Sequence, residues 1–130
     1  MELGLAGQAA IITGGSGGIG RGLLHEFARE GINVVSASRD AATSEKFAAE
    51  GKAMGLKGEI IAIATDVTNR DSVEATLAET EKRFGPVSIL INNAGGVSKA
   101  APAEVQDKKD RAWEIALNID GVVNCCQAVG

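Results

Sequence analysis

Short apolar runs alternate along the chain with longer segments in which apolar positions recur at helical spacing. The runs predict four strands, at residues 9–13, 33–38, 59–65 and 87–92. The periodic segments predict helices at residues 19–30, 43–54, 71–84 and 108–129. Thr43 or Ser44 is expected to cap the second helix, and His25 to face solvent on the first. Because the strands are continuously apolar, both of their faces should be buried, which is typical of a parallel sheet between helices.

Strands and helices that alternate in this way predict a doubly wound α/β fold with three layers, α/β/α. In the Rossmann-type version of this fold, the strand order over the part present is 3-2-1-4, so the first and fourth strands are neighbours. The two most glycine-rich turns of the chain follow Thr13 and Asn93, at the carboxyl ends of these two strands. Sheets of this kind bind ligands at that edge, so we expect a ligand there.

The turn after the first strand reads TGGSGGIG over residues 13–20 and leads into a predicted helix. Glycines let the backbone approach an anion closely, and the amides and dipole of a helix N-terminus attract negative charge. These features predict a pyrophosphate site formed by Gly14, Ser16, Gly18, Ile19 and Gly20. A plain strand-to-helix turn is the alternative, because a glycine pattern alone is a weak signal.

Composition excludes several classes of function. The 130 residues carry a net charge of −4, which argues against a nucleic-acid surface, because such surfaces need clustered lysine and arginine. No apolar stretch approaches the roughly 20 residues that cross a membrane, and residues 1–7 lack the features of a signal peptide, so we expect a cytoplasmic protein. Cys125 and Cys126 are neighbours without spaced partners, which predicts neither a disulfide framework nor a metal site.

Four motifs, in their order along the chain, resemble those of the short-chain dehydrogenases/reductases. The glycine turn is similar to the T-G-x-x-x-G-x-G turn of this family, and Asp66-Val67 is similar to its adenine-contacting pair. The run N-N-A-G at residues 92–95 resembles a family motif, and Asn118 resembles an asparagine of the catalytic set. The resemblance covers the whole chain and implies an oxidoreductase that transfers hydride between a nicotinamide and a carbonyl or alcohol substrate.

The resemblance also implies roles for residues around the expected ligand. Asp66 would accept a hydrogen bond from the adenine amino group, Val67 would pack near the ring, and Asn118 would help to hold a water for proton relay. The cofactor ribose would lie beside Asn92, Ala94 and Gly95. Each residue also has a structural interpretation: Asp66 as a turn or helix cap, the residues after the fourth strand as sheet-stiffening groups, and Asn118 as a residue that bends its helix.

The end of the second strand bears on the choice of cofactor, because an acidic residue there binds a free ribose 2′-hydroxyl and repels a 2′-phosphate. In NAD-preferring members of the family that residue is equivalent to Ser38, and here Arg39 follows directly. A guanidinium binds phosphate through paired, charge-assisted hydrogen bonds, so NADP(H) is favoured over NAD(H). Against this, Gly17 stands where some NADP-preferring relatives carry a basic residue, and Asp40 is placed to compete for Arg39. A solvated loop charge is the alternative for Arg39.

The chain contains no tyrosine, although the chemistry implied by the resemblance uses a tyrosine as general acid/base beside a lysine and a serine. In full-length relatives these three residues follow the point where this sequence stops, and only Asn118 has a counterpart. Residues 1–130 are therefore expected to be one incomplete NAD(P)-binding domain, the cofactor half of a reductase, and to be inactive as they stand. The alternative is a half-length module that binds a dinucleotide without catalysis or acts through assembly, and the substrate stays open.

The last predicted helix carries two faces that could be buried. One stripe consists of Ile115, Ile119, Val122, Cys126 and Val129. The other face consists of Trp113, Leu117, Gly121 and Asn124. Two such faces predict packing on the protein's own sheet and on a second, unspecified surface. The resemblance implies that this surface belongs to another copy, in a homodimer or homotetramer through residues 108–129. A single stripe packed on the sheet is the alternative.

Overall fold

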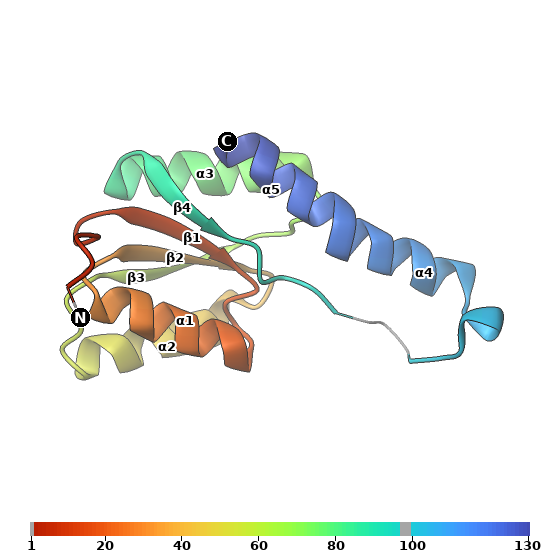
Figure 1. Cartoon of the computed structure of the whole chain (residues 1–130), viewed down its shortest axis with the longest axis horizontal. Coiled ribbons are helices and arrows are strands. Elements are labelled where there is room, and N and C mark those ends of the chain that lie inside the picture. The colour runs from red at the N-terminus through yellow and green to blue at the C-terminus, as the bar shows by residue number, and fades with distance from the viewer. Residues whose placement is uncertain (1, 97–99) are drawn as a thin grey trace.

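Four parallel strands form the centre of the molecule, in the order β3-β2-β1-β4 (Figure 1). The computed structural model describes residues 2–96 and 100–130. Its strands are β1 (Ala9–Thr13), β2 (Asn33–Ser38), β3 (Ile60–Ala64) and β4 (Val87–Ile91). All three strand pairs are parallel, and the register between β1 and β2 runs from Ala9 opposite Asn33 to Thr13 opposite Ala37. The predicted strand order and doubly wound topology are confirmed.

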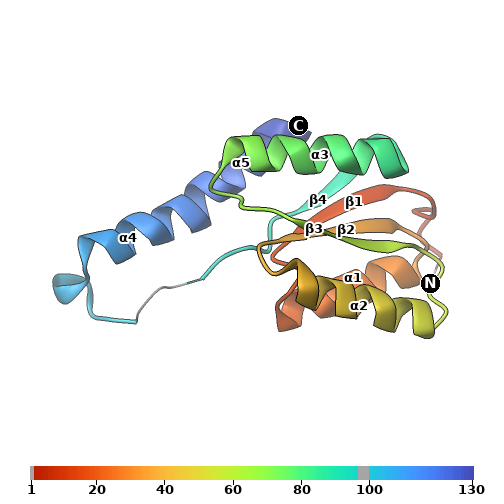
Figure 2. The same cartoon turned by 180° about the vertical axis from the view of Figure 1, so that it is seen from behind.

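Helices cover both faces of this sheet and give the three expected layers (Figures 1 and 2). One face carries α1 (Gly18–Arg29) and α2 (Ala41–Ala53). The opposite face carries α3 (Arg70–Phe84) and α5 (Gly121–Val129). α4 (Lys108–Ile115) follows a 3₁₀ turn at Ala103–Val105, projects beyond the sheet, and continues into α5 through a π-helical segment at Ala116–Asp120. In the described part of the chain, no helix is both long and apolar enough to span a bilayer.

Side chains of the central strands alternate between two apolar cores. Ala10 and Ile12 pack with the buried Leu24 and Ala28 of α1. Ile11 points to the opposite side of the sheet, where the partly buried Leu77 and Phe84 of α3 contribute. Because β1 is buried on both faces, its side chains are apolar at successive positions, which is the physical basis of the continuous run seen in the sequence.

α2 begins at Ala41, earlier than predicted, because Asp40 caps it. The Asp40 carboxylate accepts hydrogen bonds from the Thr43 amide at 3.1 Å and from the Thr43 hydroxyl at 2.6 Å. The prediction that Thr43 or Ser44 caps this helix is therefore wrong. Ser44 lies inside the first turn instead, fully buried, with its hydroxyl 2.7 Å from that of Ser36. Aspartate and serine are similarly good caps, so the sequence alone did not separate them.

His25 is not the solvated residue that the helical pattern predicted. Its side chain is only 12% exposed, and its Nε2 atom lies 3.1 Å from the Phe47 carbonyl oxygen of α2. The Glu50 carboxylate lies 3.7 Å from the same nitrogen and pairs with Arg21 at 2.9 Å. The pattern placed His25 outside the stripe that faces the sheet, but this side of α1 packs against α2 rather than facing water.

The last helix packs on the molecule chiefly through one of its two predicted faces, and Val129 of the other face joins the core cluster that contains Ile11. Gly121 and Cys125 are buried, and the Asn124 Nδ2 atom donates a hydrogen bond to the Val67 carbonyl oxygen at 2.9 Å. On the other face, Ile115 and Ile119 are 44% and 57% exposed, and Cys126 is exposed as well. A Cβ at position 121 would lie 2.7 Å from a Val67 methyl carbon, so the glycine allows this side of the helix to approach closely.

Candidate functional site

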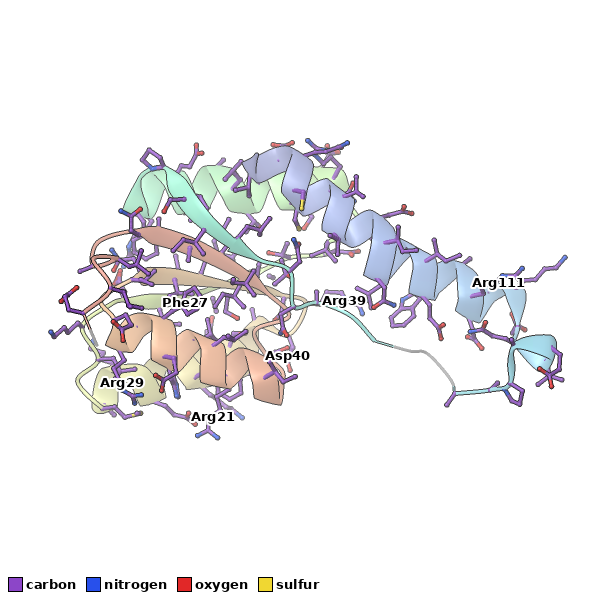
Figure 3. All side chains as sticks on the ribbon, in the orientation of Figure 1. Arg21, Phe27, Arg29, Arg39, Asp40 and Arg111 are labelled. Atoms are coloured by element: carbon purple, nitrogen blue, oxygen red, sulfur yellow. The ribbon has the colours of Figure 1, made fainter. Side chains whose placement is uncertain are left out.

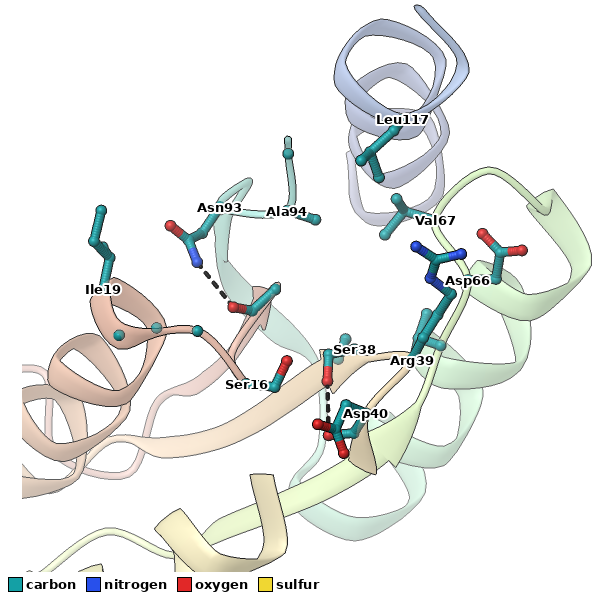
Figure 4. Close-up of a pocket in the computed structure, with 17 residues that line it drawn as sticks. Ser16, Ile19, Ser38, Arg39, Asp40, Asp66, Val67, Asn93, Ala94 and Leu117 are labelled. Atoms are coloured by element: carbon teal, nitrogen blue, oxygen red, sulfur yellow. Dashed lines mark hydrogen bonds between the residues drawn. The ribbon is translucent and has the colours of Figure 1, made fainter. Parts of the chain in front are cut away.

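A cavity of about 470 Å³ opens at the carboxyl ends of the strands, where the turns after β1, β2, β3 and β4 meet (Figure 4). It is lined by Gly14, Leu117 and residues 16–20, 37–40, 65–67 and 93–95. Every predicted cofactor-binding residue except Asn92 therefore lines the cavity, although the segments that supply them are far apart in the sequence. Asn118, the predicted relay residue, does not line it.

Glycines bring the backbone of the turn between β1 and α1 close to its neighbours. Gly14 has a φ of +66°, and a Cβ there would lie 2.8 Å from the Ala94 Cα atom in the turn after β4. A Cβ on Gly20 would lie 2.6 Å from the Gly14 carbonyl oxygen. Gly18 differs, because among the described residues, apart from its chain neighbours and the adjacent helix backbone, no heavy atom lies within 4 Å of the place its Cβ would take; its missing side chain leaves cavity space free.

The first turn of α1 presents backbone amides to the cavity without a cap. Gly17 occupies the N-cap position and has no side chain to bond these amides, and the first turn contains no acidic residue. Gly18, Ile19 and Gly20 follow as the first helical residues and line the cavity. The amides of a helix's first turn have no carbonyl partner within the helix, and the helix dipole adds positive potential. This set of donors fits a bound diphosphate.

Thr13, the last residue of β1, ties the two glycine-rich turns together. Its buried hydroxyl oxygen accepts hydrogen bonds from the amides of Asn93 and Ala94, both at 3.0 Å. The Asn93 Nδ2 atom donates in turn to the Gly14 carbonyl oxygen at 3.0 Å (Figure 4). The sequence predicted Thr13 only as part of the glycine motif, with no role of its own. Its position at a strand end beside a polar turn was the available signal.

The turn after β2 brings positive charge to the cavity. Among the described residues that line it, Arg39 is the only cation, and its guanidinium lies on the side of Asp66 and Val67 (Figure 4). Asp40 uses its carboxylate to cap α2, and the hydrogen bonds from Thr43 hold the pKa of Asp40 below its ordinary value. The sequence suggested that Asp40 competes for Arg39. In the structure its carboxylate bonds Thr43 instead.

Asp66 follows β3 and forms a turn that leads into α3. Its Oδ1 atom accepts hydrogen bonds from the Thr68 amide at 3.0 Å and from the Thr68 hydroxyl at 2.7 Å. The bond from the Thr68 hydroxyl is the main reason that the pKa of Asp66 is lowered, and the charge of Arg39 acts in the same direction. The turn interpretation from the sequence is thus correct, and the ionised carboxylate still lines the cavity.

Two predicted residues point elsewhere. Asn92 turns toward α5, where its Nδ2 atom lies 3.4 Å from the Cys126 sulfur. The Asn118 amide group holds the turn after β4: its Nδ2 atom donates to the carbonyl oxygens of Gly96 and Glu114, both at 2.8 Å, and its Oδ1 atom accepts from the Gly96 amide at 3.0 Å. In a regular α-helix the Glu114 carbonyl oxygen would accept the backbone amide of Asn118; here it accepts the Asn118 side chain, at the place where the helix widens into a π turn.

Leu117 lines the cavity from the π-helical segment, on the side of Val67 (Figure 4). It packs against the buried cluster that contains Val67, so the two residues form an apolar wall opposite the glycine turn. Sequence analysis placed Leu117 on a packing face of the last helix but not at the ligand. The widened turn lies around Asn118, which the sequence allowed as a residue that bends its helix, but the sequence did not show that this bend would bring Leu117 to the cavity.

Comparison with known families gives a match to the short chain dehydrogenase model over residues 8–130. The chain is 34% identical over 126 residues to a D-threitol dehydrogenase of Mycolicibacterium smegmatis, which covers 97% of this chain and 47% of that protein. It is 38% identical over 125 residues to a gluconate 5-dehydrogenase of Gluconobacter oxydans, which covers 96% of this chain and 48% of that protein. The chain thus spans about half the length of the curated relatives it matches.

Solved structures show the same relationship. A short-chain type dehydrogenase/reductase from Mycobacterium marinum superimposes with a TM-score of 0.88 at 31% sequence identity. The match covers 96% of this chain and 49% of that one. Sequence and fold therefore agree on the relatives of this chain.

Proposed function

Because the chain belongs to the short-chain dehydrogenase family, whose members bind NAD or NADP, we propose that it is the dinucleotide-binding half of an NADP(H)-dependent oxidoreductase. The observation that carries the proposal is the uncapped first turn of α1, whose residues line a cavity that also contains Arg39. When bound, the cofactor would supply hydride-transfer chemistry at its nicotinamide, with a carbonyl or alcohol as substrate. The residues of this chain bind and orient it.

The cavity offers a distinct environment for each part of a dinucleotide. The pyrophosphate would bind the turn formed by Gly14, Ser16, Gly18, Ile19 and Gly20. The adenine would lie beside Val67, with Asp66 as the acceptor for its amino group. The ribose would pass along Ala94 and Gly95, where small residues allow close approach. Asn92 would contribute through its backbone, since its side chain is directed at Cys126.

Arg39 would select NADP(H) by binding the 2′-phosphate, and Ser38 removes the carboxylate that would repel it. We expect Arg39→Asp to weaken NADPH binding by about 10- to 100-fold, because charge-assisted bonds to phosphate are lost, and to change NADH binding little. Fluorescence titration of the purified chain with each nucleotide measures both dissociation constants.

Arg111→Asp is the matched control for this experiment. Arg111 is an exposed arginine on α4, remote from Arg39 (Figure 3), and its replacement changes the net charge by the same amount. If Arg39→Asp weakens NADPH and NADH equally, or no more than Arg111→Asp does, the proposed cofactor choice is wrong. If the unchanged chain binds neither nucleotide, the proposed function is wrong.

The proposal also implies that the 130 residues form an incomplete domain and do not catalyse turnover. The chain contains no tyrosine to act as general acid/base, and the Asn118 side chain, the proposed relay group, is engaged by Gly96. Purified chain should not oxidise NADPH in the presence of carbonyl substrates. Intact mass of the protein in its source cells separates the two remaining possibilities: 13.3 kDa supports a half-length binding module, and about twice that mass supports a longer reductase.

We further propose that copies of the chain associate through the exposed stripe of the last helix, as a dimer or tetramer. Ile115, Ile119 and Cys126 leave an apolar surface on that side. Sedimentation should show association that Ile119→Arg abolishes, whereas only monomer at micromolar concentration would contradict this.

Two cysteines without a disulfide fit a reducing compartment, and we propose the cytoplasm.

A further inference from the structure

A chain of serine hydroxyls is buried beneath the corner between β2 and α2. The Ser36 and Ser44 hydroxyl oxygens lie 2.7 Å apart, and those of Ser38 and Ser44 lie 3.4 Å apart. The Ser38 hydroxyl donates to the Asp40 carbonyl oxygen at 3.2 Å (Figure 4). Ser36 and Ser44 are fully shielded from solvent, and Ser38 is 7% exposed. The hydroxyl chain therefore runs from Ser36 in β2 to the carbonyl group of Asp40, the residue after Arg39.

These serines stand where the surrounding core is apolar. Ser36 and Ser38 share a face of β2 with Val34, whose neighbours in the core are Ile12 and Leu24. Small apolar side chains would fill the same space without the need for hydrogen-bond partners. A buried hydroxyl must find a partner, so these three groups fix one another's directions in a way that apolar groups do not.

The same hydroxyl chain contacts the phosphate turn. A Cβ on Gly15 would overlap the Ser36 hydroxyl oxygen, so the Gly15 backbone rests directly on it. Ser36 thus touches the turn between β1 and α1, while Ser38 holds the turn that carries Arg39. The Gly14 amide bonds the Ala37 carbonyl oxygen at 2.9 Å, and the Ser44 hydroxyl adds a side-chain link between Ser36 and Ser38.

We propose that Ser44 is a positioning residue for NADP(H) selection, because it fixes the distance between the phosphate turn and Arg39. The inference rests on the proposed function, in which the first turn of α1 binds pyrophosphate and Arg39 binds the 2′-phosphate. In NADP(H) one ribose joins the 2′-phosphate to the pyrophosphate, so the spacing between these two groups is limited to a narrow range. NADPH must engage both turns at once, whereas NADH makes no use of Arg39 as a phosphate ligand. A shift of one turn against the other therefore weakens NADPH selectively.

Ser44→Ala tests this with a readout that a purely structural role would not move, namely the ratio of the NADPH and NADH dissociation constants. We expect NADPH to bind about fivefold more weakly, which is the size of effect that one buried hydrogen bond can have, and NADH to change by less than about twofold. Thr80→Val is the matched control. It removes another fully buried hydroxyl, which bonds the Thr76 carbonyl oxygen within α3, away from the cavity.

Thermal unfolding of both variants shows whether their losses of stability are comparable. If Ser44→Ala weakens NADPH and NADH by the same factor, or leaves both unchanged, the inference is overturned. If Ser44→Ala does not fold, Ser36→Ala makes the same test from the other end of the 2.7 Å bond. In the double variant the two effects on NADPH binding should not add, because both substitutions remove the same hydrogen bond between Ser36 and Ser44. Full additivity would count against the inference.

Arg39→Asp separates failure of this inference from failure of the proposed function. Where Arg39→Asp abolishes the preference for NADPH but Ser44→Ala does not alter it, Arg39 selects the cofactor without help from the serine chain. Where the unchanged chain shows no preference for NADPH, the premise fails and the inference fails with it.

Discussion

β1 and β4 are neighbouring strands of equal length whose surroundings differ. All five residues of β1 are buried, with β2 and β4 on either side and helices over both faces. None of the five residues of β4 is fully buried, and among the described residues this strand pairs only with β1. The two strands nevertheless end at the same cavity, and each is followed by a glycine-rich turn that lines it.

This difference in burial between β1 and β4 shows that the turn after β1 supports the turn after β4. The turn after β1 stands on a packed strand and continues into a helix whose first amides line the cavity. The turn after β4 is held from outside, by the Thr13 hydroxyl at its start and by the Asn118 side chain at Gly96. A ligand that contacts both turns therefore depends on the junction between a tightly packed strand and a less protected one.

The largest expected effect comes from equal substitutions in the two strands. Ile12→Ala should lower the free energy of unfolding by about 3–4 kcal/mol, because Ile12 is fully buried and its removal leaves a cavity. Ile91→Ala should lower it by about 1–2 kcal/mol, because Ile91 packs against the same core but is only partly buried. Urea denaturation measures both, and equal losses would show that β4 is as well packed as β1.

The junction itself is tested at Gly14. Gly14→Ala should destabilise the chain by about 2–3 kcal/mol and weaken NADPH binding more than about tenfold, because the new Cβ would meet Ala94 at an already left-handed φ. Gly55→Ala is the control: Gly55 has a φ of +71°, but a Cβ there would meet no atom of the described residues within 4 Å beyond its chain neighbours. It should show the backbone strain alone, about 1 kcal/mol, with no change in NADPH binding. Similar losses in the two variants would remove the role given to the contact with Ala94.

A smaller effect is expected when the hydroxyl link between the strands is removed. Thr13→Val keeps the shape of the side chain but leaves the amides of Asn93 and Ala94 without their acceptor, which should lower stability by about 1–2 kcal/mol. Hydrogen exchange of these two amides, measured by NMR, should accelerate in Thr13→Val and stay slow in Thr13→Ser. Unchanged protection in Thr13→Val would show that the turn after β4 holds its position without β1.

The smallest effect at neutral pH concerns the helix-covered side of β4, where Cys125 packs with the cluster that includes Leu90. Burial, with a further contribution from the Cys126 thiol, raises the pKa of Cys125 from 9.0 to about 11. The unfolded chain therefore loses this proton at lower pH than the folded chain, so stability is fully present below pH 9 and declines as the pH rises toward 11. Cys125→Ala should show a shallower decline in denaturation experiments across this range. An identical slope would place Cys125 in contact with water.

Local patterns in the sequence predicted much of this structure. Continuous apolar runs predicted all four strands, and the order 3-2-1-4 is the one expected of the Rossmann-type version of a doubly wound sheet. Gly31 and Gly85 adopt positive φ directly after the helices that were predicted to end at residues 30 and 84. The glycine turn, Arg39 and the pair Asp66-Val67 line one cavity as expected, because each follows a strand of a parallel sheet and all such ends lie on one edge.

The remaining features depend on contacts between segments that are distant in the sequence. The direction of Asn92 toward Cys126 and the capture of Gly96 by Asn118 require the last helix in place beside the turn after β4. The burial of the His25 side chain likewise depends on α2, which packs against it. Sequence by itself determined the order of elements, the glycine turn and the identity of the groups at the sheet edge, because these follow from periodicity and backbone sterics. Tertiary structure alone decided which polar side chains face the cavity and which secure the turns around it, because a side chain's direction is set by the partner that satisfies its hydrogen bonds.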